Sequence, residues 1–276
     1  MVPKKLMIKG ISKSFEAGTI ISAKTGLPVT FEALGKDLTS VRVIYVGEQH
    51  TDPAHHQLQL QIIEALFKSH PNLAVGMEMF DRTYQDILDQ WSGGFLAQED
   101  FLKKVHWYAN WRYNFELYSK ILGFIKVNKI RLVGLNIPPH IPPKIRIGGI
   151  ENLSDTEKQH LPKDIDTTIS AHRSYLKEAF KHHHGRVREN FEYFYLAQCV
   201  WEDIMAESVA DHLKSDMMVV LAGKGHIVRK FGIPDRAFKR TKVPFRTIYL
   251  APVGSTVEGD SGDYIWVTPQ SKNRMR

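Results

Sequence analysis

Residues 41–53 have the sequence VRVIYVGEQHTDP, which combines the features of a strand, a turn and the start of a helix. The first seven residues are rich in Val and Ile, as is typical of a strand buried on both faces of a parallel sheet. Asp52 followed by Pro53 favours a helix N-cap and the first helical position. The apolar spacing over residues 53–69 then predicts the helix itself, so this stretch indicates a strand and its crossover helix.

Five further runs of the same kind follow along the chain, each rich in Val and Ile and bounded by turn residues. They are LAVGMEM (73–79), IRLVGLN (130–136), MMVVLAG (217–223), FRTIYLA (245–251) and YIWVTP (264–269). Helical patterns at 114–128, 168–184 and 187–214 lie between them. This alternation predicts an α/β fold, with a mostly parallel sheet flanked by helices. We expect a single domain over residues 1–276.

The segment between the third and fourth of these strands is too long for one crossover helix. It begins with Pro138, Pro139, Pro142 and Pro143, whose fixed φ and missing N–H favour an extended arm over a helix. The helical patterns at 168–184 and 187–214 fill most of the remainder. We therefore expect residues 138–215 to form an inserted, mostly helical lobe.

The composition is ordinary for a globular protein, with 43% hydrophobic and 24% charged residues in 276. It excludes a disordered tail, a collagen-like fibre and a disulfide scaffold, since Cys199 is the one cysteine. No apolar stretch has the length of a membrane-spanning helix. The N-terminus MVPKKLMIKG lacks the apolar run of a signal peptide. The location therefore stays open between two alternatives. If a leader has been removed, we expect the cell envelope, as a periplasmic protein or an outer-membrane lipoprotein, and otherwise we expect the cytoplasm.

The formal net charge of +7 is concentrated in one segment, KGHIVRKFGIPDRAFKRTKVPFR (224–246), in which Asp235 is the single acidic residue. Such a segment can bind phosphates, carboxylates or anionic lipid headgroups, which would give peripheral membrane contact. The alternative is a solvated loop and helix. We expect no nucleic-acid binding, because no motif for it surrounds the phenylalanines of this segment.

Polar side chains follow four of the predicted strands. Glu48 and His50 come after the first, Glu78 and Asn136 end the second and third, and His226 follows the fourth. In open parallel sheets, ligands bind in the crevice outside the carboxyl ends of the strands. We therefore expect two carboxylates, two imidazoles and an amide at one edge of the sheet.

Two chemistries suit Glu48, His50, Glu78 and His226. They could bind Zn²⁺ or another divalent transition metal, with an open position for water or substrate. They could instead carry out metal-free proton transfer, with a histidine tuned by the carboxylates. Either would make the protein a hydrolase, with these four residues as catalytic groups. The structural alternative is that they cap helices and brace loops. For His55 and His56, at the start of the 53–69 helix, the default is a helix-surface position.

Several sequence motifs also resemble those of a known protein family. The stretches VGEQHTDPAHHQLQ (46–59), GMEMF (76–80), AQCVWEDIMAESVA (197–210) and LAGKGHIVRKFGIPDR (221–236), with Trp107, Trp111 and Tyr118, resemble the ChaN-like haem-binding proteins of bacterial iron uptake. These belong to the superfamily of the Tiki proteases and erythromycin esterases. The resemblance spans roughly residues 40–250. It implies an α/β core with a helical lobe, and haem at a homodimer interface, with a tyrosine ligand and a partner histidine at a propionate.

The same superfamily resemblance implies that Glu48, His50, Glu78 and His226 occupy metal or catalytic positions. For haem itself, the predicted lobe supplies phenol, imidazole and guanidinium groups, which suit ferric iron and propionates. We expect these to come from Tyr193, Tyr195, His183 of the cluster His182–His184, and Arg188. Tyr195 is the preferred ligand because it faces the same side of its helix as Phe191 and Gln198. The alternatives are aromatic packing for the tyrosines and a solvated helix end for the histidines.

Two functions thus remain open from the sequence. The first is a haem-binding protein for iron or haem uptake and handling, dimeric around its ligand. The second is a metal-dependent or His/Glu-based hydrolase, protease-like or esterase-like, that uses the residues at the strand ends.

Overall fold

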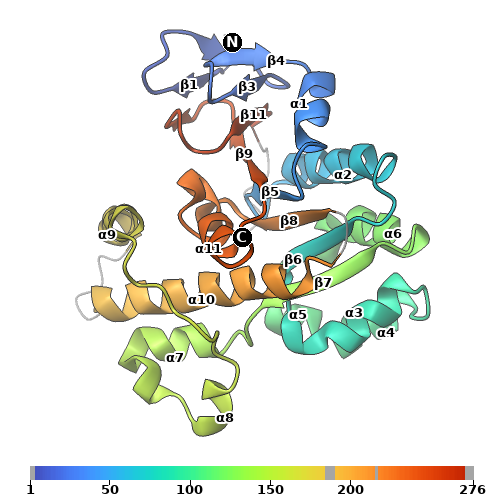
Figure 1. Cartoon of the computed structure of the whole chain (residues 1–276), viewed down its shortest axis with the longest axis vertical. Helices are drawn as coiled ribbons and strands as arrows, with labels where there is room; N and C mark the ends of the chain where they lie inside the picture. The colour runs from blue at the N-terminus through green and yellow to red at the C-terminus, as the bar shows by residue number, and fades with distance from the viewer. Residues whose placement is uncertain (1–3, 184–189, 215–216, 271–276) are drawn as a thin grey trace.

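A computed structural model of the chain describes residues 4–183, 190–214 and 217–270. Its centre is an eight-stranded sheet with the order β4-β3-β11-β9-β5-β8-β6-β7 (Figure 1). The strands are β3 (Ile20–Ser22), β4 (Leu27–Val29), β5 (Val43–Glu48), β6 (Ala74–Asp81), β7 (Arg131–Asn136), β8 (Met218–Gly223), β9 (Phe245–Pro252) and β11 (Tyr264–Thr268). From β11 to β7 all neighbours are parallel, whereas β3 and β4 are antiparallel additions at one edge.

The six strands predicted from the sequence are β5, β6, β7, β8, β9 and β11, and the α/β fold with a mostly parallel sheet is confirmed. The sequence did not predict five short strands. Two of them are β3 and β4 of the large sheet. The other three, β1 (Leu6–Ile8), β2 (Ser14–Phe15) and β10 (Thr256–Val257), form a separate three-stranded sheet. Runs of two or three residues carry too little periodicity to be recognised locally.

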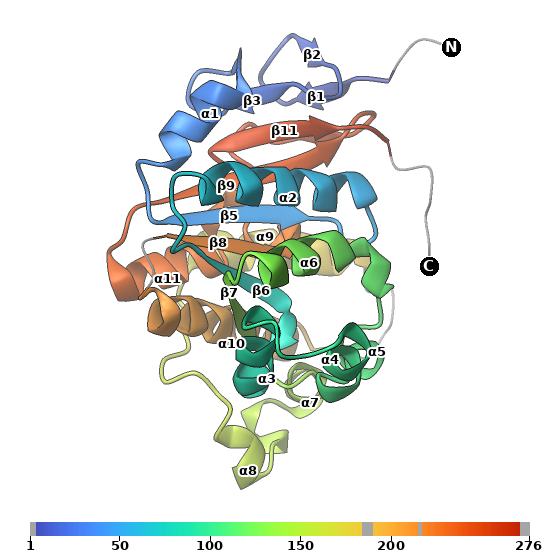
Figure 2. The ribbon, with the colours of Figure 1, turned by 90° about the vertical axis from the view of Figure 1, so that its right-hand side faces the viewer.

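Helices cover both faces of the large sheet (Figure 2). The α-helices of the described residues are α1 (Phe31–Leu38), α2 (Pro53–Phe67), α3 (Gln85–Ser92), α4 (Gln98–Lys104), α5 (Trp107–Asn110), α6 (Ser119–Val127), α7 (Ile141–Gly148), α8 (Asp155–Lys158), α9 (Ser170–His183), α10 (Phe191–His212) and α11 (Ile233–Thr241), of which α8 lies away from the sheet. The apolar core on one face is built with α1, α2, α3 and α6. The core on the other face is built with α7, α10 and α11.

The start of α2 has the predicted geometry. The Asp52 carboxylate accepts a hydrogen bond from the Ala54 N–H at 3.0 Å, and Pro53 occupies the first helical position. The prediction for the two histidines of this helix is wrong, because His55 and His56 are both buried. The helix lies with its first turn against the sheet, so that side chains expected in solvent face the interior.

Between β7 and β8 the described residues form the helices α7, α8, α9 and α10, and an inserted lobe over residues 138–215 stays a prediction. The extended arm expected at its prolines is wrong, since Pro142 and Pro143 lie in the first turn of α7. The N–H groups of a first turn have no partner within the helix, so proline loses nothing there. Helix α10 was expected to bury one apolar face. The structure buries polar side chains of this helix as well, and Glu202 and Asp203 are fully buried.

Among the described residues, no helix is long and apolar enough to cross a bilayer.

Candidate functional site

The strand order places the predicted polar residues together. The strands β5, β8, β6 and β7 lie next to one another in this order and run parallel, so their carboxyl ends meet at one edge of the sheet. At that edge Glu48 of β5 pairs directly with Gly223 of β8. Glu78 follows on β6, and Asn136 ends β7, where its amide donates to the Glu78 carbonyl at 2.8 Å. Each side chain thus reaches the edge because parallel strands end there together.

Glu48 and His50 form the first half of the cluster. His50 Nδ1 lies 2.8 Å from Glu48 Oε1, while Tyr118 and Gln59 donate to the same carboxylate at 2.6 and 2.7 Å. Burial opposes ionisation of Glu48, but the hydrogen bonds of His50 and its neighbours outweigh it and hold the pKa of this carboxyl well below its usual range. Burial likewise opposes the charge on His50, but Glu48 outweighs it and raises the pKa of the imidazole. Each of the two groups thus favours the charged form of the other.

His226 forms the second half, between two carboxylates. Its Nε2 lies 3.5 Å from Glu78 Oε1 and its Nδ1 lies 3.3 Å from Glu202 Oε1. Burial favours the neutral ring, but the charges of Glu78 and Glu202 outweigh it and raise the pKa of His226 to about 10. His226 is thus an imidazolium at neutral pH, held from both sides.

The two halves meet at Gly223. A Cβ at this position would lie 3.0 Å from the ring of His50 and 3.4 Å from Glu78, so the close approach requires glycine. Gly223 also donates its N–H to Glu78 Oε2 at 2.6 Å. The structure therefore brings Glu48, His50, Glu78 and His226 into one cluster, which we call the strand-end cluster.

Sequence reasoning missed the groups behind this cluster. Glu202 is buried in α10, where it faces His226 on one side and His172 Nε2, at 3.3 Å, on the other. Arg236 Nε lies 3.5 Å from the same carboxylate. One signal in the sequence could have indicated them. Glu202 and Asp203 stand within an apolar helical stretch, and a carboxylate buried in such a helix needs charged partners.

A metal site receives no support from this arrangement. In residues 4–183, 190–214 and 217–270, no group of three or more His, Cys, Asp or Glu side chains is placed to hold a metal ion. The expected zinc ligation by Glu48, His50, Glu78 and His226 is therefore without structural support.

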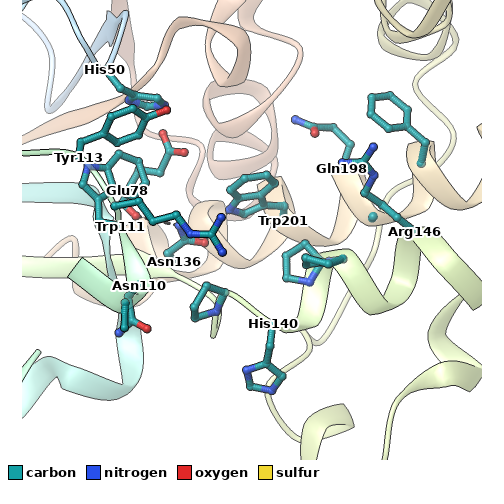
Figure 3. Close-up of a pocket in the computed structure, with 17 residues that line it drawn as sticks. His50, Glu78, Asn110, Trp111, Tyr113, Asn136, His140, Arg146, Gln198 and Trp201 are labelled. Carbon is teal, nitrogen blue, oxygen red and sulfur yellow. Dashed lines mark hydrogen bonds between the residues drawn. The ribbon is translucent and has the colours of Figure 1, made fainter. Parts of the chain in front are cut away.

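A cavity of about 600 Å³ opens beside the strand-end cluster (Figure 3). We call it the aromatic cavity because Trp111, Tyr113, Phe194 and Trp201 line it, together with His50 and Glu78 of the cluster. Figure 3 shows Trp111 and Tyr113 beside His50, with Trp201 across from them. Trp201 is fixed by its Nε1–H, which donates to Asn136 Oδ1 at 2.6 Å.

Tyr113 is the tyrosine that lines this cavity, and it was not among the haem ligands predicted from the sequence. It lies in the loop between α5 and α6, and its ring centroid is 5.2 Å from that of His50. Its hydroxyl makes no hydrogen bond to any residue the structure describes. Burial, reinforced by the negative charges of Glu78 and Glu48, raises the pKa of the phenol.

Cationic and apolar groups complete the lining. Arg112, Arg146 and His140 supply positive or protonatable groups, and Pro139, Pro142 and Pro143 supply rigid apolar surface. The guanidinium of Arg146 lies 5.3 Å from the ring centre of Phe194. The cavity thus combines aromatic walls, a phenol and cations.

The two tyrosines expected to bind haem lie outside the aromatic cavity. Tyr195 is buried, and its hydroxyl donates to the Thr167 and Ile169 carbonyls at 3.2 and 3.4 Å. Tyr193 packs near Gly149, and neither tyrosine lines the aromatic cavity. The side chain of His183 and the whole of Arg188, which complete the expected set, lie outside the described residues.

The basic segment 224–246 is largely neutralised within the chain. Its cations form ion pairs with acidic residues outside the segment: Arg229 with Asp260, Lys230 with Asp263, Arg236 and Arg240 with Asp203, Lys239 with Asp166, and Arg246 with Asp37. A surface that attracts anionic headgroups needs unpaired cations. The expected membrane contact therefore finds little support in this segment.

Comparison with known proteins agrees with the fold. The family model described as haem-binding uptake, Tiki superfamily, ChaN matches residues 34–237. The solved structure of ChaN of Campylobacter jejuni with cofacial haem covers 90% of this chain and 95% of that chain, with 20% sequence identity and a TM-score of 0.72. The match to the structure of an erythromycin esterase, EreC, covers 85% of this chain and 77% of that chain, with 13% sequence identity and a TM-score of 0.48. No curated protein matches the sequence.

Proposed function

The chain belongs to the ChaN family of haem-binding uptake proteins in the Tiki superfamily, and from this membership we propose that it binds haem in the aromatic cavity. The observation that carries the proposal is the lining of that cavity. A space of about 600 Å³ is within the range of cofactor sites, which are mostly apolar with a few polar groups. Haem uptake or handling is the biological role that follows.

Each part of the lining suits one part of the cofactor. Trp111, Phe194 and Trp201 offer flat apolar surfaces to a porphyrin. Arg112 and Arg146 offer positive charge to its propionates. The bound group would supply a ferric iron, for which the oxygen of a tyrosine is a suitable ligand.

We assign that ligand to Tyr113. It lines the cavity, and its hydroxyl is not engaged with any described residue, whereas the hydroxyl of Tyr195 is directed at backbone carbonyls. The raised pKa of Tyr113 keeps the phenol neutral until iron replaces its proton. Tyr113 therefore replaces Tyr195 as the proposed ligand.

We further propose that a second copy of the chain covers the cavity. Tyr108 on α5 and Ile147 on α7 are 61% and 78% exposed, and both helices contribute residues to the cavity wall. Large exposed apolar side chains at a cavity are typical of an association surface. The family resemblance implies a partner histidine at a propionate, and His140 is exposed and lines the cavity.

The proposal is tested by titrating ferric haem into the full chain and following the Soret band. Wild type is expected to give a saturable shift with ferric high-spin features. Tyr113→Phe removes the one ligating oxygen, so we expect its affinity to fall at least tenfold, about 1.4 kcal/mol, with loss of the tyrosinate signature. Tyr195→Phe and Tyr193→Phe are the matched controls and should bind as wild type does.

Sedimentation of the same samples tests the dimer. Haem-loaded wild type should sediment as a dimer, and Ile147→Asp should weaken that association. A Tyr113→Phe spectrum identical to that of wild type would refute the ligand assignment, and a saturated protein that stays monomeric would refute the dimer.

A further inference from the structure

A second cavity, of about 380 Å³, lies on the other side of the strand-end cluster. We call it the lysine cavity, after Lys224, and its wall includes Tyr175, Leu176, Ala179 and Tyr249. These residues come from α9, from β9 and from the turn after β8. His50 and Gln198 line both this cavity and the aromatic cavity, so the two are neighbours. Haem binding as proposed above does not use the lysine cavity.

Lys224 is one of two cations of its segment without an ion pair. Six of the eight cations pair with carboxylates, as described above, whereas Lys224 and the exposed Lys242 have no carboxylate within ion-pair distance in the described part of the chain. Its ammonium is half-buried and lies 5.8 Å from the ring centre of Tyr249. Asp52 attracts it only from farther away, and that carboxylate already caps α2. A half-buried ammonium without a counter-ion is costly unless an anion binds beside it.

Other donors lie around the same space. The hydroxyls of Tyr175 and Tyr249 make no hydrogen bond to any described residue, although both side chains line the cavity. Glu48 is the one carboxylate among the lining residues, and its oxygens already accept from Tyr118, Gln59 and His50. The one carboxylate of the lining is therefore already engaged, whereas the Lys224 ammonium and the two phenols offer donors to a ligand.

One side of the cavity wall is apolar. Leu176 and Ala179 lie on α9 next to the ring of Tyr175, which gives one side of the cavity a hydrocarbon surface. A ligand that satisfies the whole lining has an anionic head and a small apolar body.

We propose that the lysine cavity binds a small organic anion, a carboxylate or a phosphate monoester, with its head at Lys224 and the Tyr175 and Tyr249 hydroxyls and its apolar body against Leu176 and Ala179. The charge-assisted bond to the ammonium supplies affinity, and the phenols fix the orientation of the head. The site does not depend on haem, so its test is separate from that of the proposed function.

The test is calorimetric titration of the haem-free full chain with phenyl phosphate and with benzoate. We expect saturable binding of at least one of them, and none of benzyl alcohol, which has the same ring and no charge. Lys224→Met keeps the length of the side chain and removes its charge, so it should weaken Kd at least tenfold. Lys242→Met is the matched control, because Lys242 also lies 5.8 Å from a ring, that of Phe238, but is exposed and lines neither cavity.

Two further arms keep the test decisive. If Lys224→Met does not fold, as judged by circular dichroism, Tyr175→Phe removes one hydroxyl and should still weaken binding severalfold. Inorganic phosphate distinguishes a free ion from an ester, and we expect it to bind more weakly than phenyl phosphate. Absence of saturable anion binding, equal binding by Lys224→Met, or equal binding of benzyl alcohol would overturn the proposal.

Discussion

His55 is fully buried at the start of α2, and its two ring nitrogens have different partners. The Gln49 N–H donates to Nδ1 at 2.9 Å, and Nε2 lies 3.2 Å from Thr268 Oγ1. A backbone N–H can only donate, so Nδ1 is the acceptor and the proton of the neutral ring is on Nε2. Burial lowers the pKa of His55 to about 3, and nearby Lys224 adds to the effect. The folded protein thus requires a neutral His55.

This requirement predicts a loss of stability in acid. As pH falls below 6.5 towards 3, the unfolded chain binds a proton at His55 that the folded chain does not. The free energy of unfolding should therefore fall by about 1.4 kcal/mol per pH unit from this residue. His55→Asn keeps an acceptor for Gln49 but does not titrate. Urea unfolding at several pH values should show a variant that is less stable near neutral pH and has a shallower pH dependence. Equal slopes would contradict this account.

At the scale of elements, the packing of β7 against the end of β6 depends on Gly134. A Cβ there would lie 2.9 Å from the Asp81 carbonyl oxygen and 3.0 Å from Leu88 Cδ1. The register of the two strands shifts between Met77 and Asp81, which brings the end of β6 across β7. The backbone at this crossing cannot yield as a flexible side chain would, so Gly134 is required by close approach.

Gly134→Ala should therefore lower the free energy of unfolding by about 1–3 kcal/mol, as overpacking does. Gly123→Ala is the matched control. Gly123 lies inside α6, where a Cβ would meet no atom within 4 Å, so alanine should stabilise the helix by about 0.5–1 kcal/mol. Chemical denaturation of both variants measures the contrast. A Gly134→Ala protein as stable as wild type would show that the two strands can separate without cost.

At the scale of the whole molecule, Arg236 joins segments that are far apart in the sequence. It lies on α11, is fully buried, and donates to Asp203 of α10 and to the Asp166 carbonyl at 2.9 Å. Its guanidinium also faces Glu202, which holds His226 on its other side. A buried ionic network thus runs from the strand-end cluster to the helices behind it.

Removing Arg236 takes the buried guanidinium away from two buried carboxylates, and it leaves Asp203 with Arg240 and Glu202 with His226 and His172 as their remaining charged or protonatable partners. Arg236→Leu should therefore lower the free energy of unfolding by about 3–5 kcal/mol. Arg229→Ala breaks an ion pair of the same segment whose carboxylate, Asp260, is 67% exposed, and should cost less than about 1 kcal/mol. Equilibrium unfolding tests both variants, and similar losses in the two would argue against a special role for the buried network.

The sequence by itself determined the centre of the sheet and its polar edge. Six strands were recognisable because a strand buried on both faces is a continuous apolar run. Glu48, Glu78 and His226 could be expected at one edge, since parallel strands end together. The cap of α2 was equally local, because Asp52 acts on a residue two positions away.

Tertiary structure decided which side chains surround that edge. Tyr113 reaches the aromatic cavity, and Glu202 reaches His226, through the packing of segments far apart in the chain. The burial of His55, and the start of a helix before Pro142, likewise depend on neighbours that no local pattern records. Periodicity and turn chemistry act over a few residues, whereas a cavity and its charges arise from contacts between distant segments, which exist only once the chain has folded.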